Sequence, residues 1–238
     1  MRSRDWILDR RAAAVAEMID SSRSPDLRKL FVIEGDELVT SCIRSRFFSD
    51  DDVFKSREFE IICRRGQVIQ AVAKFTEWAA CRGIPGGRDF VLSTDMRSQS
   101  DYDCANMLME HWEEFDHPVE SGEPLIIFDR LVIAEPHPDI WPALTAAIEK
   151  AFKRRGGTMV LKAFPLEWEG ASDGKPVTEE PMFDRRLVAM KKLYARRLGM
   201  KEIPNNDDGW MWKAIGHSMP PSPTRVRQPD KLAADLEL

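Results

Sequence analysis

Cysteine and histidine are the side chains that most often hold a metal ion, and this 238-residue sequence contains four of each. The cysteines form no C-x-x-C pair and have no histidine set near them: Cys42, Cys63, Cys81 and Cys104. Their spacing is unlike that of a structural zinc site and indicates reduced thiols in the core. His111 falls within a segment of helical periodicity, so we expect it to be a packing or surface residue and not a ligand.

A phosphate-binding loop is the second chemistry that the residue types suggest. The segment CRGIPGGRDF brings Gly86 and Gly87 together, but it has neither the G-x-x-x-x-G-K-[ST] pattern nor the G-x-G-x-x-G pattern. The two glycines therefore predict a turn that ends the preceding element.

The composition is that of a folded globular protein without a strong charge bias. Apolar residues make up 43% of the chain, and 35 basic against 40 acidic residues give a net charge of -5. This balance disfavours nucleic acid as a partner, and we expect the basic clusters at 153–155 and 191–197 to be solvated helix faces. The charged N-terminal segment does not resemble a signal peptide, and no segment has the length of a membrane span. The sequence therefore predicts a cytoplasmic protein without a membrane partner.

The first half of the chain, residues 1–123, mixes short elements of both kinds. The spacing of apolar residues predicts these elements: a helix at 4–21, a strand hairpin within 30–46, a strand at 58–63, a helix at 67–81, a strand at 90–93 and a helix at 102–115. We interpret this half as a divergent part of the same sheet that the second half builds.

The second half has a sharper pattern. The predicted elements follow in this order: a strand at 124–133, a helix at 140–152, a strand at 158–166, a loop at 169–181, a helix at 184–198 and a strand at 210–215. Gly199 is expected to cap the second of these helices, and residues 216–238 are expected to form a flexible tail. The alternation of strands and helices indicates an α/β (α+β) fold with helices packed on a sheet, and residues 1–215 together form one domain.

Three segments of the second half resemble the GNAT superfamily of N-acetyltransferases. LVIAEPHPDIWPALTAAIEKAFKRRG is similar to the fourth strand, pyrophosphate loop and third helix of that family. LKAFPLEWE is similar to its fifth strand, and LYARRLGMKEIP with GWMWKAI resembles its closing helix, Leu-Gly-Phe turn and final hairpin. The resemblance covers residues 124–215 and implies a mixed, mostly antiparallel twisted sheet with helices on both faces. It also implies acetyl-CoA as cofactor and transfer of an acyl group to an amine.

The resemblance places the coenzyme's diphosphate at the start of the helix that begins near Ile140, where backbone amides and the helix dipole favour an anion. The family's Q/R-x-x-G-x-G/A pattern is replaced here by Pro-His-Pro-Asp-Ile-Trp at 136–141. We expect Asp139 to cap the helix with its own carboxylate, which would occupy those amides and repel a phosphate. Trp141 fills the place of a glycine, and His137 is the side chain that could contact a phosphate instead.

The resemblance also implies where proton transfer would occur. The family's thiolate-protonating tyrosine would align with Ala195, and Tyr194 lies one residue earlier, about 100° around the helix. Tyr194 is thus expected to pack in the core, and it is also the candidate general acid. Asp129 and Glu135 are the candidate bases for the amine proton. The backbone of Ile133 and Ala134 would bind the pantetheine arm.

Two functions stay open at this point. The first is an N-acyltransferase that uses acetyl-CoA, with a small-molecule or protein amine of unknown identity as acceptor. The second is a catalytically silent GNAT-like module that binds another protein, or a second copy of itself, through the old cleft or through a tryptophan-rich end made of Trp141, Trp168, Trp210 and Trp212. The failure of two motif positions favours the second function, and the preserved order of elements favours the first.

Overall fold

The computed structural model describes residues 27–49, 53–81, 87–111, 123–154, 156–164, 181–206 and 208–216. They form an eight-stranded sheet with the order β1-β2-β3-β4-β5-β6-β8-β7. The strands are β1 (Arg28–Glu34), β2 (Val39–Arg44), β3 (Phe54–Arg65), β4 (Val68–Ala80), β5 (Leu125–Ile133), β6 (Thr158–Lys162), β7 (Lys201–Glu202) and β8 (Trp210–Ala214). Every neighbouring pair is antiparallel except β5 and β6, which are parallel. The predicted fold class, a mixed and mostly antiparallel sheet with helices, is confirmed.

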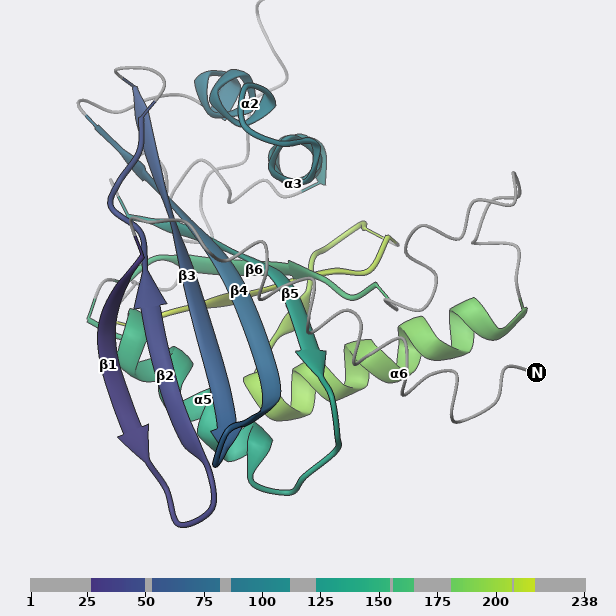
Figure 1. The fold of residues 1–238 in the computed structure, drawn as a ribbon. Helices are drawn as coiled ribbons and strands as arrows, with labels where there is room; N and C mark the ends of the chain where they lie inside the picture. Colours follow the sequence, from purple (N-terminus) through teal and green to yellow (C-terminus); the bar gives the residue numbers. More distant parts are fainter. Residues whose placement is uncertain are drawn as a thin grey trace, which may run out of the picture.

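Helices cover both faces of this sheet (Figure 1). The helices α5 (Ile140–Phe152) and α6 (Pro181–Leu198) pack on one face, and α2 (Gly87–Asp95) and α3 (Gln99–His111) lie against the other. A parallel connection needs a crossover, and α5 provides it between β5 and β6.

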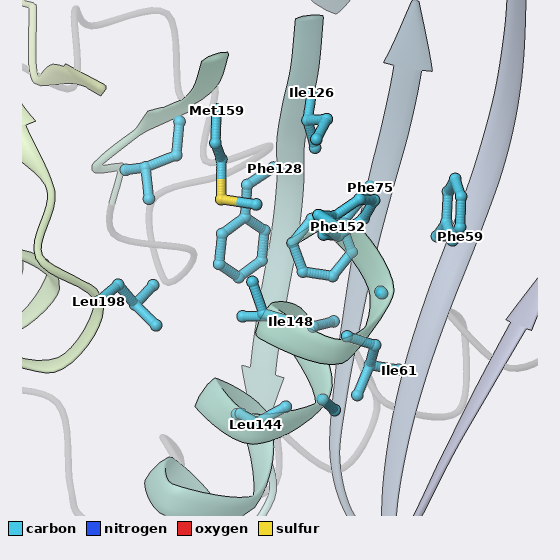
Figure 2. Close-up of a cluster of buried hydrophobic side chains, with 14 of the residues drawn as sticks. Phe59, Ile61, Phe75, Ile126, Phe128, Leu144, Ile148, Phe152, Met159 and Leu198 are labelled. Carbon is cyan, nitrogen blue, oxygen red and sulfur yellow. The ribbon is translucent and has the colours of Figure 1, made fainter. Parts of the chain in front are cut away.

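The core under α5 is built on aromatic contacts (Figure 2). Phe75 stacks on Phe128 across β4 and β5 with ring centroids 4.4 Å apart. Phe152, at the end of α5, lies 4.9 Å from the ring of Phe59 and 5.3 Å from that of Phe75. These rings are buried, so they attach the helix to three neighbouring strands at once.

Two predicted elements are wrong: a helix predicted at 67–81 and a strand predicted at 90–93. Residues 67–81 were expected to form a helix and form β4 instead. Both faces of this central strand are covered, so apolar residues occupy nine of its 13 positions without strict alternation, and the pattern of a strand is hidden. Residues 90–93 were expected to form a strand but lie in α2, where Phe90 is fully buried and Leu92 is 60% exposed.

The other predicted strands and helices that fall on described residues are confirmed within a few residues. Gly199 has a φ of 70° after α6 and its amide bonds the carbonyl of Ala195, as expected of a C-terminal cap. The helix at 4–21, most of the loop at 169–181 and nearly all of the C-terminal tail lie outside the described residues.

Candidate functional site

The candidate site is built around a bulge in β5. Lys74 pairs with Arg130 and Phe75 pairs with Phe128, which leaves Asp129 as an extra residue without a partner on β4. Before the bulge Phe128 faces the core under α5, and after it Leu131 faces the same core. One inserted residue thus keeps the apolar side chains on one face while it turns a carboxylate to the other.

Beyond the bulge, β5 loses one of its neighbours. Its pairing with β6 ends at Phe128 and Leu161, whereas β5 continues to Ile133. The amide of Ala134 donates to the carbonyl of Gln70, 2.9 Å away, so this residue is bonded to the β4 side. Antiparallel neighbours alternate, and the backbone groups of Ile133 therefore point toward the side that β6 has left.

The side chain of Asp129 keeps an exposed surface, although protein atoms closely surround its carboxylate, and Thr76 holds one of its oxygens. The Thr76 hydroxyl donates to Oδ2 of Asp129 over 2.8 Å. The surrounding protein removes water from the carboxylate and raises its pKa to about 7, and the charge of Asp101 raises the pKa further. The hydrogen bond from Thr76 and the charge of Arg97 act in the opposite direction. A carboxylate with such a pKa is poised to accept and release a proton near neutral pH.

Arg97, in the short connection between α2 and α3, contacts three of the polar side chains around this carboxylate. Its Nη1 lies 2.5 Å from Oδ2 of Asp101 and 3.1 Å from the Thr76 hydroxyl, and its Nη2 lies 3.1 Å from Oε1 of Glu58. None of these charged residues was among the candidate site residues predicted from the sequence. The spacing of Arg97 and Asp101, four residues apart at the start of a helix, is the one signal that could have indicated the pair.

Tyr194 lies on the opposite face of β5. Its side chain is 8% exposed, and its ring contacts those of Phe128 and Trp141, both with centroids 6.4 Å away. Burial raises its pKa to about 12, so the hydroxyl keeps its proton at neutral pH. Ala195, the position that matches the family's tyrosine, is exposed. The expectation that Tyr194 packs in the core is confirmed, and the packing places it beside the residue that precedes Asp129.

Glu135, the second candidate base, is exposed in the loop after β5. No described residue forms a hydrogen bond or ion pair with its carboxylate. The structure thus fixes the orientation of Asp129 through a neighbour but gives Glu135 no such support.

The start of α5 differs from the sequence prediction. Asp139 is the N-cap residue, but its carboxylate makes no capping hydrogen bond, so the predicted cap is wrong. The carboxylate lies 3.6 Å from Nδ1 of His137 instead. The amide of Ile140 donates to the His137 carbonyl over 3.2 Å, and Pro142 has no amide. Among the first three residues of α5, only the amide of Trp141 is therefore left to bind an anion. One amide is too few to hold a diphosphate.

His137 lies between two carboxylates and beside a guanidinium. Its Nε2 is 3.4 Å from Oε2 of Glu37 and also close to the guanidinium of Arg65, which bonds Glu37 over 2.7 Å. Glu37, His137 and Asp139 are near enough to one another to suggest a cation site. Two observations argue against a cation there. The guanidinium of Arg65 already supplies a positive charge to this cluster. Glu37 lies near Nε2 of His137 and Asp139 lies near Nδ1, so the two carboxylates approach opposite sides of the imidazole. The same carboxylates would repel a phosphate.

Three further predictions can be compared with the described residues. Cys42, Cys63 and Cys104 are buried free thiols, as expected, and Cys81 is partly buried. In the basic cluster of α6, Lys192, Arg196 and Arg197 are exposed, as expected of a solvated face. In the part of the chain that the structure describes, no helix combines the length and apolar character that crossing a membrane requires.

Comparisons with protein-family models, with curated proteins and with solved structures returned no match to this chain.

Proposed function

We propose that this protein is an N-acyltransferase that moves an acyl group from acyl-CoA, with acetyl-CoA as the simplest donor, to an amine. The observation that carries the proposal is the position of Asp129, whose carboxylate lies on a bulge at the point where β5 and β6 separate and accepts a hydrogen bond from Thr76. Bulges next to active sites commonly redirect a side chain in this way.

The chemistry needs one proton acceptor and one proton donor. The amine nitrogen forms a bond to the thioester carbon and loses a proton to Asp129, and the carbon–sulfur bond breaks. The departing thiolate takes a proton from Tyr194, whose hydroxyl is protonated at neutral pH. Asp129 and the ring of Tyr194 lie on opposite faces of β5 at adjacent points of the strand, since Tyr194 contacts Phe128. For both groups to reach one thioester, its carbonyl carbon must lie beside β5 in the opening where the pairing with β6 has ended.

The backbone of β5 supports the placing of the coenzyme. The groups of Ile133 that point away from β4 are suited to bind the amides of a pantetheine arm, which the resemblance to the GNAT superfamily also implies. Ala134 contributes less, because its amide is already bonded to Gln70. In this proposal, the coenzyme is gripped mainly along its arm.

The start of α5 makes the affinity for the coenzyme low. Charge-assisted hydrogen bonds contribute on the order of 1.5 to 3 kcal/mol each, and most of the amides that would form them are engaged or missing. Of the residues at this position, Ile140 is fully buried and presents no surface to a coenzyme, whereas Trp141 is partly exposed and is left to contact it. His137 is held by Glu37, Arg65 and Asp139.

Calorimetric titration with acetyl-CoA and with CoA, followed by a thiol-release assay with a panel of amines, tests the proposal. We expect saturable binding with a dissociation constant below about 1 mM, and thiol release that depends on the amine. No binding at millimolar coenzyme overturns the proposal. If the coenzyme binds but no amine causes thiol release, the coenzyme site is supported and the proposed transfer reaction is overturned.

The second candidate, a silent binding module, is favoured by one observation: the anion site at α5 is filled by the chain's own residues. Its partner would be a protein or a second copy of the chain. The tryptophan-rich end gives it little support, because Trp210 is 5% exposed and Trp141 and Trp212 are partly buried. We propose a cytoplasmic location for the protein under either candidate function.

A further inference from the structure

A chain of two hydrogen bonds connects Arg97 to Asp129. The guanidinium donates to the Thr76 hydroxyl over 3.1 Å, and that hydroxyl donates to Oδ2 of Asp129 over 2.8 Å. A guanidinium has no acceptor, whereas a hydroxyl both accepts and donates. Because Arg97 takes up the acceptor side of Thr76, the hydroxyl proton is directed to the carboxylate.

Arg97 itself is held from two further directions. Asp101, on α3, has a side chain that is 2% exposed, and Glu58 lies on β3 opposite Thr76. The guanidinium is therefore fixed between a helix and two strands. The α2–α3 pair, which lies outside the segment that resembles a known family, thus reaches the Thr76 hydroxyl through the side chain of Arg97.

We infer that Arg97 is a positioning residue, which orients Asp129 through the Thr76 hydroxyl so that Oδ2 is held and Oδ1 is left for the amine. The inference rests on the proposed function for its role in catalysis. The orientation itself can be measured without any activity, because it changes how Asp129 titrates.

The charges that face Asp129 come from every element packed around it. Glu58 on β3 and Asp101 on α3 are negative, Arg97 is positive, and the Cys104 thiol on α3 is neutral, its pKa raised by burial and by nearby carboxylates. Arg97 is the cation whose charge lowers the pKa of Asp129. Loss of either Arg97 or the Thr76 hydroxyl should raise the pKa of Asp129, because each now lowers it.

Carbon-13 NMR of the side-chain carboxyls, with Asp129→Asn to assign the signal, measures this pKa. We expect Thr76→Val to raise it by at least about 0.5 unit and Thr76→Ser, which keeps the hydroxyl, to restore it. Arg97→Gln should raise it in the normal background and raise it less when Thr76 is already valine, because the part transmitted by the hydroxyl is gone. Thr40→Val removes another buried strand hydroxyl, which contacts Cys63, and should leave the Asp129 titration unchanged.

Two outcomes overturn the inference: an unshifted titration in Thr76→Val, or an Arg97→Gln shift of the same size in both backgrounds. If Arg97→Gln fails to fold because Asp101 is left unpaired, the comparison of Thr76→Val with Thr76→Ser still decides the first of these. In the variants that raise the pKa of Asp129, the rising limb of the pH profile of turnover should shift to higher pH by the same amount. The coupling without any turnover refutes the acyltransferase alone, and turnover with an unshifted titration refutes the positioning role alone.

Discussion

Two aspartates, one in the middle of β5 and one at the end of the loop that follows it, have opposite surroundings. Asp129 receives a hydrogen bond from Thr76 and lies among groups that raise its pKa to about 7. Asp139, ten positions later at the start of α5, forms no capping bond and lies beside His137 in an exposed cluster. Residue type alone would rank Asp139 as the structural residue, since aspartate is a preferred helix cap. The contacts show otherwise, because the Asp139 carboxylate caps nothing and the Asp129 carboxylate is held by Thr76. We therefore expect the proposed function to depend on Asp129.

The largest difference between the two aspartates should appear in turnover. Asp129→Asn removes the proposed proton acceptor and should lower kcat/KM on the order of 10²- to 10⁴-fold, the range of general acid–base catalysis. Asp139→Asn, the matched control, should have little effect. The measurement is thiol release at saturating amine, with folding checked by circular dichroism. Equal losses in the two variants would remove the distinction between these sites.

Tyr194 touches both regions, because its ring contacts Phe128 on one side and Trp141 on the other. Tyr194→Phe keeps this packing and removes the proposed proton donor, so turnover should fall about 100-fold while coenzyme affinity stays the same. An acyl donor with a more acidic thiol needs less protonation and should show a smaller loss. A variant with unchanged turnover would exclude Tyr194 from the reaction.

The order of the strands and both helices of the β5-to-β8 half could be predicted, because long periodic segments leave one interpretation. β4 could not, since a strand covered on both faces hides its alternation. The bulge is also invisible in the sequence, where Asp129 is only a polar break in an apolar run. Its proton chemistry depends on Arg97 and Thr76, which the chain brings from 32 and 53 positions away, and such meetings depend on the tertiary fold and not on local pattern.

The pH dependence of stability offers a test of Asp129 that needs no substrate. Its pKa rises from 3.8 to about 7 on folding, so between these values the folded state keeps a proton that the unfolded state has lost. The free energy of unfolding contributed by this group should therefore fall as pH rises from about 4 to about 7. Asp129→Asn lacks this titration, and its stability relative to the parent protein should increase over that range in urea denaturation. A constant difference would contradict the raised pKa.

The smallest effect is expected at Asp139. Replacement of an aspartate that caps a helix usually costs about 1 kcal/mol. Because the Asp139 carboxylate makes no such bond, Asp139→Ala should change the free energy of unfolding by less than about 0.5 kcal/mol. Denaturant unfolding of the two proteins measures it. A loss of 1 kcal/mol or more would mean that the side chain caps the helix in solution.

The extra residue in β5 can be lost without disturbing the core. Deletion of Asp129 would restore regular pairing with β4, and Leu131 and Ile133 would still face the aromatic core under α5. The same deletion would remove the carboxylate. Proteins descended from the same ancestor could therefore lose this acidic group in a single genetic event and keep the packing of the strand.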